Sequence, residues 1–144
     1  MIHAKVSELR KAYSRHLSLY KNVSVSNASI ITQNLILCYA VECGLKCLIM
    51  QRYRIGTTEH LFNHVDLEYL YNSPHNLTLM LKTAKCPRKL HNLPAITTKS
   101  NANVDCSRYH EVWRYGIEIQ NEKLERNIVE ILKDITYWLD EQIR

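Results

Sequence analysis

Hydrophobic residues recur at every third or fourth position near the start of the chain, which is the spacing of one helical face. Charged residues fill the positions between them, on the side expected to face solvent. This pattern predicts a helix over residues 4–21, built on Val6, Leu9, Tyr13, Leu17 and Tyr20. A break follows at Ser24, Ser26 and Asn27, and we expect one of these residues to cap the next helix.

Residues 27–53 carry two hydrophobic stripes and predict a long helix. The first stripe contains Ile31, Leu35, Cys38 and Leu45, and the second contains Ile36, Ala40, Cys43 and Cys47. A helix that is apolar nearly all round is buried on more than one side, so this one is the centre either of a bundle or of a dimer. Four polar residues make it a poor membrane span, namely Gln33, Asn34, Glu42 and Lys46.

The second half of the chain predicts shorter elements and a long closing helix. Short helices are expected over 61–71 and 76–84, then a short helical turn within 105–116 and a long helix over 120–143. Residues 85–104 have little periodicity and predict a long loop. This loop is basic, so it would either grip a phosphate backbone or be a solvated connector; its basic residues include Lys85, Arg88, Lys89 and Lys99.

The composition favours one all-α domain over residues 1–144. A chain of 144 residues is long enough to bury a core without a disulfide or a metal. Three glycines and three prolines are few for a strand-rich fold. The net charge of +5 permits contact with RNA, DNA or an acidic protein but requires none of them.

The five cysteines indicate reduced thiols and a cytoplasmic location. Their number is odd, and the first residues do not form a secretory leader. Cys43 and Cys47 lie four apart and could be half of a metal site, but no second pair has zinc-site spacing. We therefore interpret them as small core residues. The sequence has no Gly-rich phosphate loop and no Gly-x-Ser-x-Gly elbow, and we expect no cofactor and no metal.

Three segments resemble the HEPN superfamily. Residues 40–49 resemble its Ala-x-Glu-x-x-Leu-Lys signature, with Glu42 and Lys46 spaced for a helical ion pair. Residues 64–71 are similar to its His-Asp-Leu-x-x-Leu element, with Val65 inserted after His64. Residues 113–116 contain the Arg-Tyr pair found in many members. The resemblance implies an up-and-down helical bundle with two long helices and several shorter ones.

HEPN proteins are best known as metal-independent endoribonucleases that act as dimers in toxin–antitoxin and antiviral systems. Their hallmark is an Arg, then four to six intervening residues, then a His; the Arg holds phosphate and the His is a general acid or base. Past residue 105 the only histidine is His110, two residues after Arg108, so the hallmark is missing from its usual place. Arg54 and His60 have the spacing, but in another part of the chain.

Two functional hypotheses follow. The first is a non-catalytic or degenerate HEPN-like domain in a prokaryotic toxin–antitoxin or antiviral system. It would act through homodimerisation and through binding a protein encoded nearby, a nucleotide or a nucleic acid such as RNA. The alternative is a ribonuclease with a variant site, made by Arg54 and His60 or by Arg108, His110 and Arg114. A DNA-binding regulator is disfavoured, because no helix–turn–helix with a basic recognition helix is evident.

A structural role is also open to the charged residues of the HEPN-like segments. Glu42, Lys46, His64 and Arg114 would then form one buried polar network, with Arg114 paired to Glu42 or Asp66. Tyr115 would help to close the bundle beside Arg114. Because a buried charge needs a partner, these residues would hold one another in place.

Overall fold

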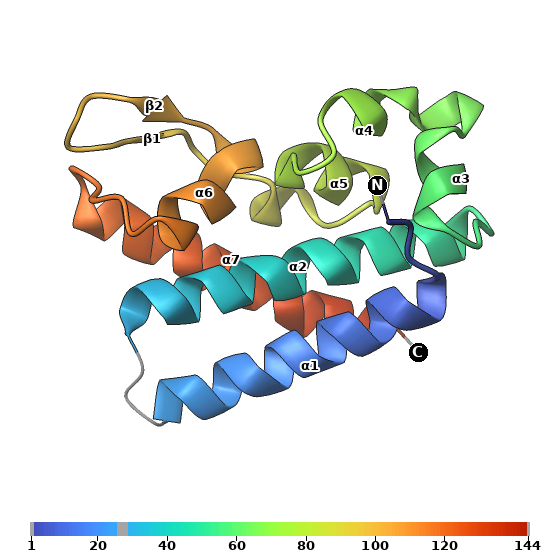
Figure 1. Ribbon diagram of the computed structural model, residues 1–144, viewed down its shortest axis with the longest axis horizontal. Helices are drawn as coiled ribbons and strands as arrows, with labels where there is room; N and C mark the ends of the chain where they lie inside the picture. Colours follow the sequence, from blue (N-terminus) through green and yellow to red (C-terminus); the bar gives the residue numbers. More distant parts are fainter. Residues whose placement is uncertain (1, 26–28, 144) are drawn as a thin grey trace.

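Three long helices dominate the computed structural model, which describes residues 2–25 and 29–143 (Figure 1). They are α1 (Val6–Val25), α2 (Ile30–Arg52) and α7 (Glu122–Gln142). The predicted all-α bundle is confirmed, with three long helices where the resemblance implies two. Each lies within a few residues of its predicted range. The predicted break and cap at Ser24, Ser26 and Asn27 were wrong in part, because α1 continues through Ser24 and the N-cap of α2 is Ser29. Ser26 and Asn27 lie outside the described residues.

Helix α2 is the centre of the bundle, packed against α1, α5, α6 and α7 (Figure 1). Both of its stripes contribute fully buried residues, such as Leu45 in the first and Ala40 and Cys47 in the second. The Cys47 Sγ lies 3.9 Å from the carbonyl oxygen of Val6 in α1. The chain therefore covers much of the second stripe itself, so this stripe gives no support to a dimer.

By length and composition α2 could also cross a membrane, and it is the one helix of residues 2–25 and 29–143 for which this holds. In the folded chain, 67% of the most apolar 18-residue stretch of α2 is buried. Such burial is what a core helix shows, and it explains why the segment is apolar nearly all round.

A glycine in α2 lets α1 and α7 approach closely. A Cβ atom at Gly44 would lie 2.7 Å from the Tyr13 ring and 2.8 Å from a methyl group of Leu139. The Tyr13 hydroxyl is held in turn by hydrogen bonds to the Thr136 carbonyl oxygen at 3.1 Å and to Asp140 Oδ1 at 2.5 Å. The ring therefore has little freedom to move away.

Replacing Gly44 by alanine is expected to lower the free energy of unfolding by about 1–3 kcal/mol, because the new methyl group overpacks the contact. Urea denaturation measures this loss. Gly56→Ala is the matched control, since a Cβ atom there meets nothing within 4 Å, and we expect it to change stability by less than about 0.5 kcal/mol. Equal losses in the two variants would show that the close approach at Gly44 is relaxed in solution.

The helix predicted over 61–71 is instead three short elements. These are α3 (Thr58–Phe62), the 3₁₀ turn η1 (Val65–Leu67) and α4 (Glu68–Asn72). His64 causes the interruption, because its extended backbone leaves the helix and its Nδ1 accepts a hydrogen bond from the Asp66 N–H at 3.2 Å. The helix predicted over 76–84 is present as α5 (Leu77–Thr83).

Residues 85–104 are mostly irregular, as expected of a long loop, but they pack onto the bundle and contain short regular elements. They form the 3₁₀ turn η2 (Arg88–Leu90) and an antiparallel hairpin of β1 (Ile96–Thr97) and β2 (Asn103–Val104). The apolar residues of the segment are buried, namely Leu90, Leu93, Ile96 and Val104. The basic side chains Lys85, Arg88, Lys89 and Lys99 are exposed. The 3₁₀ turn η3 (Cys106–Arg108) and α6 (Tyr109–Arg114) then lead towards α7.

Candidate functional site on the polar face of α2

A nearly buried carboxylate lies halfway along α2. Glu42 is 9% exposed, and its Oε1 accepts hydrogen bonds from Lys46 Nζ at 2.8 Å and from His75 Nδ1 at 2.7 Å. The ion pair expected between Glu42 and Lys46 is therefore present. His75 was not among the predicted site residues; it lies between α4 and α5 just before Asn76, the N-cap of α5.

Two opposing effects set the pKa of Glu42. Burial disfavours the charged carboxylate and raises the pKa, but the hydrogen bond from His75 and the charge and hydrogen bond of Lys46 outweigh it. The net result is a pKa lowered to about 2. Glu42 is therefore ionised at neutral pH and holds the imidazole of His75 with its Nδ1–H towards the carboxylate. The Nε2 atom of His75 is left for other partners, and half of this side chain is exposed.

A second histidine lies against the first. His110 in α6 is 8% exposed, and its ring centroid is 5.0 Å from that of His75. Burial, and then the charge of His75, lower the pKa of His110. At neutral pH this imidazole is therefore largely uncharged. An ionised carboxylate, a carboxylate-bound imidazole and an uncharged imidazole thus lie within one cluster.

An arginine held by a tyrosine extends this cluster along α2. Arg114 lies one helical turn after His110 in α6, and its Nε and Nη2 donate to the Tyr39 hydroxyl oxygen at 3.2 and 2.8 Å. The Tyr39 ring is 5.9 Å from that of His16 in α1. Arg114 itself is exposed, with its guanidinium 6.0 Å from the centre of the Tyr115 ring. We call the connected surface the polar face; it comprises His16, Tyr39, Glu42, Lys46, His75, His110 and Arg114.

The buried network expected from the sequence is only partly present. His64 is not a partner of Glu42: it caps η1, and its ring lies 5.6 Å from that of Tyr53. Arg114 bonds to Tyr39 instead of Glu42 or Asp66, because α6 places it beside the preceding turn of α2. Tyr115, which was expected to help close the bundle, is 67% exposed.

The other candidates for a variant ribonuclease site do not converge. Arg54 and His60 are both exposed, and the structure shows no hydrogen bond or ring contact between them. The Arg108 Nε donates to Glu111 Oε2 at 2.8 Å on the outside of α6. Among the residues predicted for a variant site, two belong to the polar face, namely His110 and Arg114.

The cysteines are free, and burial raises the pKa of several of their thiols. The pKa of Cys43 and of Cys86 is raised to about 11, so both remain protonated thiols at neutral pH. Within residues 2–25 and 29–143 no group of three His, Cys, Asp or Glu residues could hold a metal ion. The groups that the polar face itself offers are a carboxylate, imidazoles and cations.

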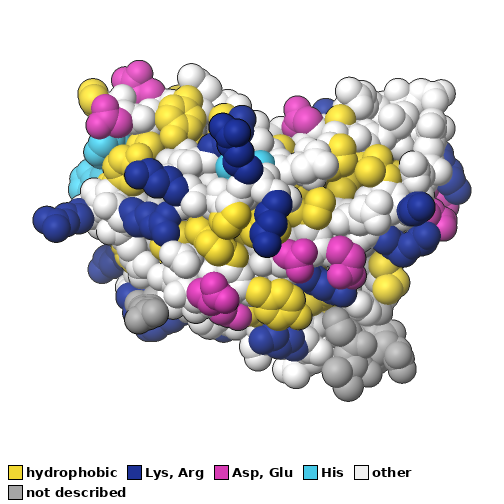
Figure 2. Space-filling view, turned by 180° about the vertical axis from the view of Figure 1, so that it is seen from behind, with side chains coloured by type: hydrophobic (Ala, Val, Ile, Leu, Met, Phe, Trp, Pro, Cys, Tyr) yellow, Lys and Arg dark blue, Asp and Glu magenta, His cyan; other side chains and the backbone are white. Residues whose placement is uncertain are grey.

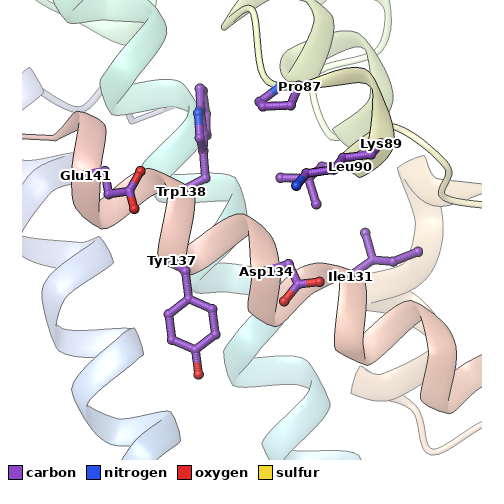
Figure 3. Close-up of a pocket in the computed structure, with 8 residues that line it drawn as sticks. All are labelled: Pro87, Lys89, Leu90, Ile131, Asp134, Tyr137, Trp138 and Glu141. Carbon is purple, nitrogen blue, oxygen red and sulfur yellow. The ribbon is translucent and has the colours of Figure 1, made fainter.

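A groove with a volume of about 560 Å³ lies between η2 and α7, away from the residues of the polar face. Figure 3 shows Pro87 and Leu90 facing Trp138 and Ile131 across it. Its lining includes one lysine and two carboxylates, Lys89, Asp134 and Glu141. Over the whole face seen from behind, basic and acidic side chains are interspersed with hydrophobic ones (Figure 2). The described residues form no hydrogen-bonded acid–base pair across this groove, so the polar face is the stronger candidate.

Comparisons of the chain with protein-family models, with curated proteins and with solved structures find no match. The geometry of the polar face therefore carries the functional proposal.

Proposed function

We propose that the protein is a HEPN-like helical domain that binds single-stranded RNA along the polar face. The observation that carries this proposal is the Arg114–Tyr39 contact, which fixes an exposed guanidinium in one orientation. Arginine pairs with phosphate through two parallel hydrogen bonds. A guanidinium already positioned loses less side-chain entropy when it does so.

Groups around Arg114 suit the rest of a nucleotide. The rings of Tyr39 and Tyr115 lie beside the guanidinium, and the His16 ring lies next to Tyr39. All three rings can stack with unpaired bases. Burial, and then the charge of nearby Arg15, lower the pKa of His16. Arg15 is therefore a second cation next to this surface. Glu42 does not repel a phosphate strongly, because His75 and Lys46 surround it.

In this proposal the domain acts by binding, as a homodimer or with a protein partner encoded nearby. Its setting would be a prokaryotic toxin–antitoxin or antiviral system, as the resemblance to HEPN proteins implies. A mass measurement in solution tests the homodimer independently of RNA.

Arg114→Ala is expected to weaken the binding of a generic single-stranded RNA and to reduce its dependence on salt. Losing one phosphate contact lowers the slope of log affinity against log salt by about 0.7 for a single strand. Fluorescence anisotropy at several salt concentrations measures both effects. Arg126→Ala is the matched control, since this arginine is also exposed but lies on α7. Equal changes in the two variants, or none in Arg114→Ala, would overturn the proposal.

A second candidate function, a metal-independent endoribonuclease, is favoured by the contact of Glu42 with His75 beside His110. His110 is largely uncharged and suits the general base that takes the proton from a ribose 2′-hydroxyl. The 2′-oxygen would then attack phosphorus, and the bond to the 5′-oxygen would break. His75, whose imidazole the Glu42 carboxylate holds through Nδ1, suits the acid that gives the leaving oxygen its proton. The candidate site is thus the Glu42–His75–His110 cluster instead of an Arg…His motif.

A further inference from the structure

A small cleft lies at the end of the polar face, beyond Lys46. It has a volume of about 360 Å³ and is formed by the end of α3 and by α4; its lining residues are Phe62, Asn63, Glu68, Tyr71 and Asn72. The Lys46 Nζ lies 5.9 Å from the centre of the Phe62 ring. The cleft therefore adjoins the proposed path of the RNA, and it takes no part in the Glu42–His75–His110 cluster.

Two aromatic rings form the walls of this cleft. Phe62 and Tyr71 meet edge to face, with ring centroids 6.2 Å apart and planes at 67°. Phe62 is half-buried, whereas Tyr71 is 61% exposed. An exposed tyrosine ring beside a fixed aromatic wall is a surface on which an unpaired base stacks.

The remaining walls are polar and carry unused hydrogen-bonding groups. The side chains of Asn63, Glu68 and Asn72 are exposed, and they form no hydrogen bond or ion pair with any of the residues that the structure describes. Two amides supply both donors and acceptors, while an ionised carboxylate only accepts. The cleft thus combines a stacking surface with the groups that read the edge of a base.

We propose that this cleft binds one base of a single-stranded RNA and prefers guanine. Guanine has two neighbouring donors, N1–H and the N2 amino group, that match the two oxygens of the Glu68 carboxylate. In adenine, cytosine and uracil the donor on this edge has an acceptor beside it, which a carboxylate repels. The two asparagine amides can serve the O6 and N7 acceptors of the same base.

The position of the cleft fits a strand that also contacts Arg114. Tyr39, which holds Arg114, and Lys46, which lies over Phe62, are seven residues apart in α2, or about 10.5 Å at the helical rise per residue. A short stretch of RNA can therefore reach both places at once. In this respect the inference rests on the proposed function, although the cleft can be tested with mononucleotides alone.

The test is binding of guanosine 5′-monophosphate to the full chain, compared with the adenosine, cytidine and uridine monophosphates. Calorimetry or NMR titration should show the guanosine nucleotide bound at least about fivefold more tightly than each of the others. Glu68→Gln should remove this preference, and Tyr71→Ala should weaken binding of all four nucleotides about tenfold. The matched controls are Tyr137→Ala and Glu122→Gln, which alter exposed residues of the same types on α7 and should change neither result.

Each other outcome has a definite meaning. Equal affinity for the four nucleotides would overturn the preference for guanine. Failure of all four to bind, or binding that Tyr71→Ala leaves unchanged, would overturn the cleft as a base site even if RNA binding still depended on Arg114. Guanosine nucleotide binding that depends on Glu68 and Tyr71 would support the inference even if Arg114→Ala had no effect on RNA, a result that overturns only the proposed function.

Discussion

Replacing Glu42 by alanine is expected to lower the free energy of unfolding by about 3 kcal/mol, measured by urea denaturation at neutral pH. The reason is that two hydrogen-bonding partners of Glu42 would remain without it. Lys46, whose side chain is only 14% exposed, and His75 would both lose the carboxylate that accepts their hydrogen bonds. Removing one member of a nearly buried ion pair costs more than the pair contributes, because the remaining charge is poorly solvated.

Glu130→Ala is the matched control for this variant. Glu130 also pairs with a lysine, Lys133, but on the exposed surface of α7, with 67% of its side chain accessible. We expect its loss to cost less than about 1 kcal/mol. A similarly small effect of Glu42→Ala would show that the α2 pair is hydrated in solution.

The free energy of unfolding at acid pH gives a second test of the role of Glu42. The pKa of Glu42 is about 2 in the folded protein against an ordinary value of 4.5, so folding favours the charged form. The resulting stability is fully present above pH 4.5 and is lost as the pH falls towards 2. It amounts to about 3 kcal/mol at 1.36 kcal/mol per pKa unit. Glu42→Ala should therefore flatten the stability curve between these two pH values.

The parts of the structure that depend on neighbours within one helix were predictable from the sequence. The two stripes of residues 27–53 predict a helix buried on more than one side, and α2 has that position. Glu42 and Lys46 are four residues apart, so helical geometry alone brings them together. The long helices were found for the same reason, since many turns repeat one pattern.

The histidine that completes the cluster could not be found in this way. His75 lies 33 residues after Glu42, in a segment of a few residues that fixes no periodicity. One indirect signal was available: a charged pair within an apolar helix implies a further polar partner, and Pro74 and Asn76 mark an ordered turn around His75. Neither feature says which of the seven histidines that partner is.

The predictions that were wrong also have physical explanations. Arg114 was expected near Glu42, but the short helix α6 places His110 there and Arg114 beside Tyr39. The hairpin within residues 85–104 was missed because each of its strands has two residues. Strands of that length are too short for alternation to appear in the sequence.

If the chain is a ribonuclease, we expect the pure protein to cleave single-stranded RNA without a divalent metal and to leave a 2′,3′-cyclic phosphate end. His75→Ala should then lower the cleavage rate at least about a hundredfold, because the leaving 5′-oxygen loses its proton donor. The cleavage rate should show a bell-shaped pH dependence, as expected when one imidazole must be protonated and the other not. Glu42→Gln should also lower the cleavage rate, since it removes a carboxylate oxygen that holds His75 Nδ1.

His60→Ala is the matched control for His75→Ala, and it also separates the two proposed locations of a catalytic site. His60 is an exposed histidine on α3, and it forms the formal Arg…His spacing with Arg54. Loss of cleavage in His60→Ala with full activity in His75→Ala would move the site to Arg54 and His60. Absence of cleavage by pure protein, with or without metal, would exclude the ribonuclease and leave RNA binding through Arg114 as the proposed function. Cleavage that fails only in His75→Ala would assign the chemistry to the cluster on α2, since a carboxylate-held imidazole is what distinguishes His75 from His60.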